Sequence, residues 1–210
     1  MAQGPLRVVV ADDHPYYRRG LVRSLRARGI DVVAEAPNGE AAIRAVEQTA
    51  PDVVVMDLKM PGMSGFEATR QLTARAPECR VVVLSVSDDE EDVSEAVLAG
   101  ACGYVLKESP VDEVVAGIRA AAAGESHISQ AITTPLLRRL REAAGVQPAM
   151  ASVRLSDREQ AVLDLLARGH DDDAIADTLA VSASDVRRHA SGILTKLVHA
   201  AVRASGGRGP

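Results

Sequence analysis

The 210-residue chain is poor in aromatic residues, cysteine and long apolar runs. With one Phe, three Tyr and no Trp, its cores must be packed by Val, Leu, Ile and Ala, and few rings remain to stack on nucleic-acid bases. The two cysteines, Cys79 and Cys102, predict reduced thiols rather than a disulfide framework. No apolar run approaches membrane length and no secretory leader is visible, so we expect a cytoplasmic protein that does not contact membranes.

Signatures of common enzymes are missing as well. The sequence has no Cys/His spacing typical of a metal site and no Gly-rich phosphate loop of the Walker type, and its five histidines are scattered. We therefore expect no enzyme in the ordinary sense. Apolar residues make up 47% of the chain, which is ample for a core, and the length suits two small domains better than one large one.

Charge is divided unevenly along the chain. Residues 1–123 carry 13 basic and 19 acidic side chains, whereas residues 124–210 carry 11 basic and 10 acidic ones. The acidic first part suits a cation-dependent site, and the second part is only marginally basic.

Five polar residues each stand just after, or at the end of, a short apolar run. They are Asp12, Asp13, Asp57, Ser85 and Lys107. The carboxyl ends of parallel strands meet at one edge of a sheet, where open α/β folds bind their ligands. The sequence therefore predicts a single acidic pocket.

Three carboxylates in one pocket repel one another, so the pocket must hold a proton or a cation. Mg²⁺ is the expected cation, because it prefers a few carboxylates together with water and phosphate oxygens. Asp57 can then act as a nucleophile toward a phosphoryl group. Lys107 offers a positive charge and Ser85 a hydroxyl for the phosphoryl oxygens.

Short β-branched runs alternate with helical segments from Leu6 to about Ala123, which predicts a doubly wound α/β domain with a parallel sheet of five strands. The expected strands are Leu6–Ala11, Asp31–Glu35, Asp52–Asp57, Arg80–Ser85 and Gly103–Leu106. We assign residues 1–123 to this domain and 124–150 to a linker. A short helix beginning near Thr134 and a tether over 143–151 are expected within the linker.

The last part of the chain, residues 151–210, predicts a small all-α domain. Ser156 and Glu159 have the spacing of a capping box before a first helix, which stops near Gly169. A second helix is expected over Asp171–Leu179, and Ser182 is a suitable cap for a third. Two helices joined by a tight turn are typical of a helix-turn-helix that enters the DNA major groove.

The first domain resembles the receiver domain of bacterial two-component response regulators, which has a flavodoxin-like fold. The segments that carry the resemblance are VVVADDH, VVVMDLKMPGMSG, VVVLS and GYVLK. The resemblance implies that Asp57 accepts phosphate from a histidine kinase. It also implies that Asp13, Asp57 and the carbonyl of Lys59 bind Mg²⁺ directly, with Asp12 acting through water. Ser85 and Tyr104 would form the switch pair, which phosphorylation draws inward.

The last domain resembles the helix-turn-helix output domain of the NarL/LuxR (FixJ) family, through LSDREQAVLDLLARG, AIADTLAVS and DVRRHASGILTKL. The resemblance implies a transcription regulator that forms a phosphorylation-dependent homodimer and binds DNA. Val186 is expected to face inward, with Arg187, Arg188 and Ser191 on the exposed face of the third helix. The expected DNA-binding residues are Val186, Arg187, Arg188, His189 and Ser191.

Acidic residues in the last domain leave a second interpretation open. Asp173 stands where the family has a phosphate-contacting Lys, and Asp185 replaces a Thr at the start of the recognition helix. Residues 151–210 carry eight basic and eight acidic side chains, which disfavours strong binding to DNA phosphates. After Leu197 the family usually has a turn and a fourth helix, whereas residues 198–204 of this chain are expected only to lengthen the third helix. The alternative is a phosphorylation switch that acts through protein contacts or as a phosphate sink.

Overall fold

The computed structural model describes residues 5–129, 132–133 and 153–205. The chain divides into two compact units, residues 1–125 and 126–210, which are described separately. The linker helix expected near Thr134 and the tether expected over 143–151 lie outside the described residues.

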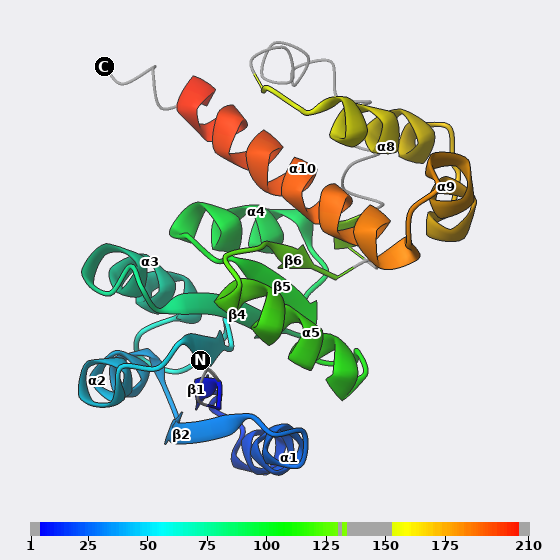
Figure 1. Ribbon diagram of the computed structural model, residues 1–210. Helices are drawn as coiled ribbons and strands as arrows, with labels where there is room; N and C mark the ends of the chain where they lie inside the picture. Colours follow the sequence, from blue (N-terminus) through cyan, green and yellow to red (C-terminus); the bar gives the residue numbers. More distant parts are fainter. Residues whose placement is uncertain (1–4, 130–131, 134–152, 206–210) are drawn as a thin grey trace. The chain divides into compact units, whose positions relative to one another are not determined.

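The first unit alternates strands and helices from end to end (Figure 1). Its elements are β1 (Arg7–Ala11), α1 (Pro15–Arg26), β2 (Asp31–Ala36), α2 (Gly39–Thr49), β3 (Val53–Met56), α3 (Gly65–Arg75), β4 (Arg80–Ser85), α4 (Glu90–Ala99), β5 (Gly103–Leu106) and α5 (Val111–Ala122). These bounds agree with the predicted strands to within a residue at each end. Helices α2 and α3 begin at side-chain caps, in which Asn38 accepts from the N–H of Ala41 and Ser64 accepts from that of Glu67.

Within the first unit the strands follow the order β2-β1-β3-β4-β5 in the sheet. The four pairs among β1–β5 are all parallel. Five strands were predicted, and the described residues hold six: the additional strand, β6 (His127–Ile128), is only two residues long, shows no periodicity in sequence and belongs to the second unit.

Two cores lie on opposite faces of this sheet. One face packs Val8, Val10 and Val53 against α1 and α5, and the other packs Val9 and Val54 against α2 and α3. Successive strand residues alternate between the two cores because side chains of a strand point to opposite faces. The observed arrangement is the doubly wound one that was predicted.

The second unit carries the helices α8 (Asp157–Ala167), α9 (Asp172–Leu179) and α10 (Ala183–Ser205). The predicted capping box opens α8: the hydroxyl of Ser156 accepts from the N–H of Glu159, whose carboxylate accepts from the N–H of Ser156. Ile175, Ile193 and Leu194 are among the fully buried residues that join the three helices. Helix α10 runs to Ser205, so residues 198–204 do extend the third helix.

Both cysteines are free thiols. Cys79 is buried and Cys102 half-buried, and burial raises the pKa of the Cys79 thiol to about 11. Among the described residues, no helix combines the length and apolar character needed to cross a membrane.

Candidate functional site

The register of the parallel strands brings the predicted pocket residues together. Ala11 pairs with Met56, so Asp12 and Asp57 follow directly at the same edge of the sheet. Ser85 pairs with Leu106, so Lys107 comes next to it. Backbone hydrogen bonds continue the ladder beyond the strands: Asp57 N–H donates to Ala11 O at 2.9 Å, and Lys107 N–H donates to Ser85 O at 2.7 Å.

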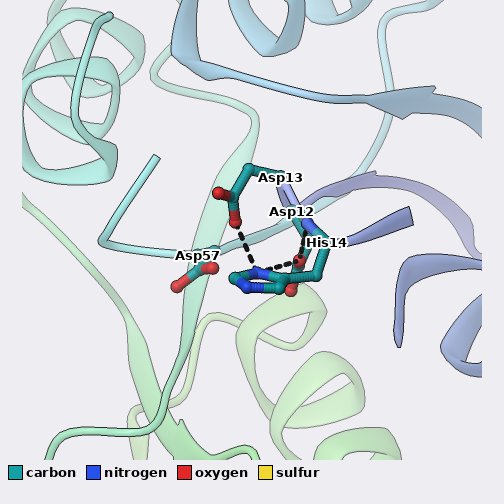
Figure 2. A group of neighbouring side chains, drawn as sticks. All are labelled: Asp12, Asp13, His14 and Asp57. Atoms are coloured by element: carbon teal, nitrogen blue, oxygen red, sulfur yellow. Dashed lines mark hydrogen bonds and ion pairs between the residues drawn. The ribbon is translucent and has the colours of Figure 1, made fainter. Parts of the chain in front are cut away.

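Three carboxylates and one imidazole converge at this edge (Figure 2). One oxygen or nitrogen from each of Asp12, Asp13, His14 and Asp57 lies within 4.8 Å of the others. Asp12 is 2% exposed and Asp57 4%, whereas Asp13 is partly open to solvent. The predicted group of carboxylates, Asp12, Asp13 and Asp57, therefore does come together.

His14 joins the pocket in a way that the sequence did not indicate. The backbone of His14 is the N-cap of α1, and its ring faces the carboxylates, with Nδ1 2.7 Å from Asp13 Oδ1. The backbone N–H of His14 also donates to Asp12 Oδ1 at 2.8 Å, which fixes the turn that leads from β1 into α1. The only indication in the sequence that His14 contacts the carboxylates was that it directly follows two aspartates.

Lys107 neutralises two of the carboxylates. Its Nζ lies 2.6 Å from Asp57 Oδ2, where it donates a hydrogen bond, and 2.7 Å from Asp12 Oδ2. The contact with Asp12 is an ion pair that is not aligned as a hydrogen bond. The Lys107 side chain is 11% exposed, so the charge acts in a largely water-excluded place.

Burial and charge oppose each other at these two groups. Burial raises the pKa of Asp57 above its ordinary value, and the hydrogen bond and charge of Lys107 only partly offset this. For Lys107, burial lowers the pKa, but its close contacts with the negative charges of Asp12 and Asp57 outweigh it and the net shift is upward. Lys107 therefore stays charged, while burial disfavours the charged form of the Asp57 carboxylate that it contacts.

The donor set fits a small hard cation. Asp13 Oδ1 is buried and accepts no hydrogen bond in the structure; its 2.7 Å contact with His14 Nδ1 is an ion pair only if the imidazole is protonated. A carboxylate oxygen that accepts no hydrogen bond, beside two further carboxylates, is the type of ligand that Mg²⁺ prefers. The N–H of Lys59 donates to Asp57 Oδ1 at 3.4 Å, which brings the backbone of residue 59 close to the Asp57 carboxylate.

Gly65 is needed for this geometry because its lack of a side chain lets the start of α3 approach the backbone of Asp57. A Cβ at this position would lie 1.9 Å from the carbonyl oxygen of Asp57. No other residue can therefore occupy the start of α3 without moving the backbone of Asp57. The Gly65 N–H donates to Leu58 O at 2.9 Å and holds the two segments together.

The predicted switch residues share a partner on the loop after β4. Ser85 Oγ accepts a hydrogen bond from the N–H of Ser87 at 3.1 Å, and Tyr104 Oη donates to Ser87 O at 2.8 Å. Burial raises the pKa of the Tyr104 hydroxyl to about 12. The Tyr104 ring is fully buried, so it already lies inward in this structure, whereas we expected phosphorylation to draw it there.

The five predicted DNA-binding residues are spread over different faces of α10. Arg187 and Arg188 are exposed and His189 is partly exposed. Val186 is fully buried in the core of the second unit, where it faces inward as expected and supports the helix rather than presenting a side chain to DNA.

Ser191 does not lie on the exposed face, so that prediction was wrong. It is 1% exposed, and its hydroxyl accepts from the N–H of Ile128 at 2.9 Å and donates to Ile128 O at 3.2 Å. The backbone of β6 therefore covers this position of α10. Helical spacing alone placed Ser191 with the two arginines. The two-residue strand β6, which covers Ser191, cannot be recognised from the sequence.

Acidic residues offset the charge of both arginines, by an ion pair at Arg188 and by a weaker charge attraction at Arg187. Asp185 Oδ1 accepts from Arg188 at 2.5 Å, while its Oδ2 accepts from the hydroxyl of Ser182 at 2.6 Å. Asp172 is buried, with one oxygen that receives no hydrogen bond. Burial raises the pKa of Asp172, and the charge of Arg187 partly opposes that shift.

Two family models match the chain. Residues 8–119 match the response regulator receiver domain, and residues 153–203 match the bacterial regulatory proteins of the luxR family. The nitrate/nitrite response regulator protein NarL of Escherichia coli (strain K12) is 37% identical over 196 residues, which cover 93% of this chain and 90% of that protein.

Solved structures agree with these matches. A LuxR-family two-component response regulator from Aurantimonas sp. SI85-9A1 is 37% identical with a TM-score of 0.62, over 64% of this chain and 97% of that chain. Response regulator ChrA of a heme-sensing two-component system is 32% identical with a TM-score of 0.56, over 97% of this chain and 99% of that one. The likeness thus extends over both units.

Proposed function

Because the chain belongs to the response regulators, which join a receiver to a LuxR-type domain and regulate transcription under the control of phosphorylation, we propose that Asp57 is its phosphoacceptor. The observation that carries the proposal is the position of the Asp57 carboxylate, which lies beside two further aspartates and 2.6 Å from the ammonium of Lys107. A histidine kinase is the expected donor, in the cytoplasm.

The residues around Asp57 have separate roles in the transfer. Asp13, Asp57 and the carbonyl of Lys59 would hold Mg²⁺, with Asp12 acting through water. When bound, the ion supplies positive charge that offsets the phosphoryl oxygens. An oxygen of Asp57 forms the new bond to phosphorus while the bond from phosphorus to the donor's imidazole nitrogen breaks, and the leaving nitrogen keeps the electron pair. Lys107 remains charged and contacts a phosphoryl oxygen.

Ser85 and Tyr104 link this chemistry to the surface. A phosphoryl oxygen on Asp57 would accept a hydrogen bond from the Ser85 hydroxyl, whose oxygen now accepts from the Ser87 N–H at 3.1 Å. Since Tyr104 Oη also bonds to residue 87, a shift of Ser85 changes the loop that both residues hold. The loop after β4 is therefore the first part of the backbone to respond.

The output of the switch is DNA binding by a phosphorylation-dependent homodimer. Arg187, Arg188 and His189 would approach DNA from α10, because an exposed Arg can contact guanine or phosphate. Ser191 can join them only after its two hydrogen bonds to Ile128 break. Val186 supports the helix from inside.

A second candidate output is protein interaction without DNA. Its support is the pairing of Arg188 with Asp185 and the attraction between Arg187 and Asp172, which reduce the positive charge that α10 offers to phosphates. The equal numbers of basic and acidic residues in 151–210 point the same way.

Fluorescence anisotropy on promoter DNA, with and without beryllofluoride and Mg²⁺, separates the two outputs. Sequence-selective binding that strengthens with beryllofluoride supports the DNA-binding output, and its absence in both states at low salt rules it out. Asp173→Lys adds a positive charge at the exposed start of α9. DNA binding that appears only in this variant favours the interaction output.

A further inference from the structure

Tyr17 touches both ends of the lysine in the phosphoacceptor pocket. The Tyr17 ring faces the ammonium group, with the ring centroid 4.9 Å from Lys107 Nζ. Its hydroxyl donates to the backbone oxygen of Lys107 at 3.4 Å. The body of the ring packs against the core cluster formed by α1, α5 and the sheet. A rigid aromatic side chain of α1 therefore contacts both the charge and the backbone of Lys107.

The other contacts of Lys107 Nζ are ones that the reaction must change. In the resting site its Nζ lies between Asp12 and Asp57, at 2.7 and 2.6 Å. Phosphorylation alters one of these carboxylates and cation binding draws on both. The face of an aromatic ring attracts a cation within about 6 Å, so Tyr17 offers the ammonium group a contact that does not depend on either step.

We propose that Tyr17 is a positioning residue for Lys107, which keeps the ammonium group over the acceptor while its carboxylate partners change. This inference rests on the proposed phosphorylation of Asp57. With acetyl phosphate as donor, an Asp57 oxygen bonds to phosphorus, the bond from phosphorus to the acetyl oxygen breaks, and acetate leaves with the electron pair. Lys107 keeps its proton throughout, so the ring contributes by holding a charge in place.

Flexibility of the lysine is the physical reason that such a contact matters. A lysine side chain is a flexible four-carbon stem with a strongly hydrated charge at its end. Once Asp57 is no longer a free carboxylate, an ammonium group without the ring turns toward solvent more easily. Removal of the ring therefore destabilises the transition state more than the resting site, because in the resting site two carboxylates already hold the Lys107 ammonium group.

The rate of phosphorylation of the full-length chain by acetyl phosphate and Mg²⁺, followed by intact-protein mass spectrometry, tests this role. Tyr17→Leu is expected to react about five-fold more slowly, the size of an ordinary cation–π contact. Tyr17→Phe keeps the ring and is expected to stay within about two-fold of the wild type. The matched control is Tyr16→Leu, because Tyr16 is 88% exposed, and it is expected to leave the rate unchanged.

A series of fluorinated phenylalanines at position 17 separates charge attraction from packing. Fluorine withdraws electron density from the face of the ring while its shape changes little, so the rate is expected to fall stepwise from Phe to trifluoro-Phe. Mg²⁺ affinity is expected to stay constant across the series, and Lys107→Met is expected to abolish the dependence on fluorination. The series also decides the question if Tyr17→Leu proves unfolded in a circular dichroism check.

The possible failures are distinct. Equal rates for Phe and trifluoro-Phe, in a protein whose wild type is phosphorylated at Asp57, overturn the positioning role alone. A wild type that takes up no phosphoryl group under any of these conditions overturns the proposed function and this inference with it.

Discussion

The hydroxyl of Ser191 gives the sharpest test of how the second unit is held together. Two hydrogen bonds join it to the backbone of Ile128, both of them buried. Ser191→Ala leaves the Ile128 N–H without its acceptor, which costs about 1–3 kcal/mol. If strand β6 detaches locally from α10, that cost corresponds to about a five- to 150-fold increase in the detached population.

Amide hydrogen exchange at Ile128 measures this population directly. We expect exchange at this amide to accelerate by about five-fold or more in Ser191→Ala, with little change at core amides such as that of Ile193. Ser184→Ala is the matched control, because Ser184 is an exposed serine of the same helix. Unchanged exchange at Ile128 would refute the reasoning. In the unphosphorylated protein DNA affinity should rise in Ser191→Ala, and a fall would show that the hydroxyl contacts DNA instead.

Three further predictions concern stability and the metal. Lys196→Met removes the ion pair of Lys196 Nζ with Glu159, 2.7 and 2.8 Å from its two oxygens, and should lower the unfolding free energy by about 0.5–1 kcal/mol at pH 7. Burial alone would raise the pKa of Glu159, but Lys196 and Ser156 lower it below its ordinary 4.5. The stabilisation is therefore present above pH 4.5 and lost as the pH falls through the folded-state pKa of Glu159. The unfolding free energies of wild type and variant, measured by urea titration, should converge in acid, and a difference that stays constant with pH would contradict this. Ala180 ends α9 with a left-handed φ of 51°, so Ala180→Gly should raise the unfolding free energy by up to about 1 kcal/mol in urea titrations, and a loss of stability would contradict the assigned strain. Mg²⁺ at ten times its dissociation constant should stabilise the wild type by about 1.4 kcal/mol in thermal unfolding. Asp13→Asn removes one negative charge from the acidic cluster and should lose most of that gain, and equal stabilisation of both proteins would contradict the role of Asp13.

The pocket could be predicted from sequence because each of its residues is tied to the end of a strand. Parallel register fixes where strand ends meet, so Asp12, Asp57 and Lys107 had to come together once the strands were identified. Helix starts were equally accessible, since Ser156 and Asp171 cap their helices through contacts three residues away. These features depend on short stretches of sequence or on a repeating geometry.

The features that escaped prediction depend on contacts between distant or irregular segments. The burial of Ser191 comes from Ile128, 63 positions earlier in the chain, through a strand too short to show a pattern. The orientation of the His14 ring depends on a rotamer, and the tight approach of Gly65 to Asp57 depends on the path of a loop. The Tyr17 contact with Lys107 spans 90 positions and has no sequence signature.

The central claim is that a crowded group of carboxylates recruits Mg²⁺ and lets Asp57 accept a phosphoryl group. Intact-protein and peptide mass spectrometry of wild type and Asp57→Asn, after reaction with acetyl phosphate with and without Mg²⁺, tests it most directly. The account predicts one added phosphoryl group, located on Asp57, in the wild type with Mg²⁺ only. Equal labelling of Asp57→Asn, or labelling that does not depend on Mg²⁺, would contradict it.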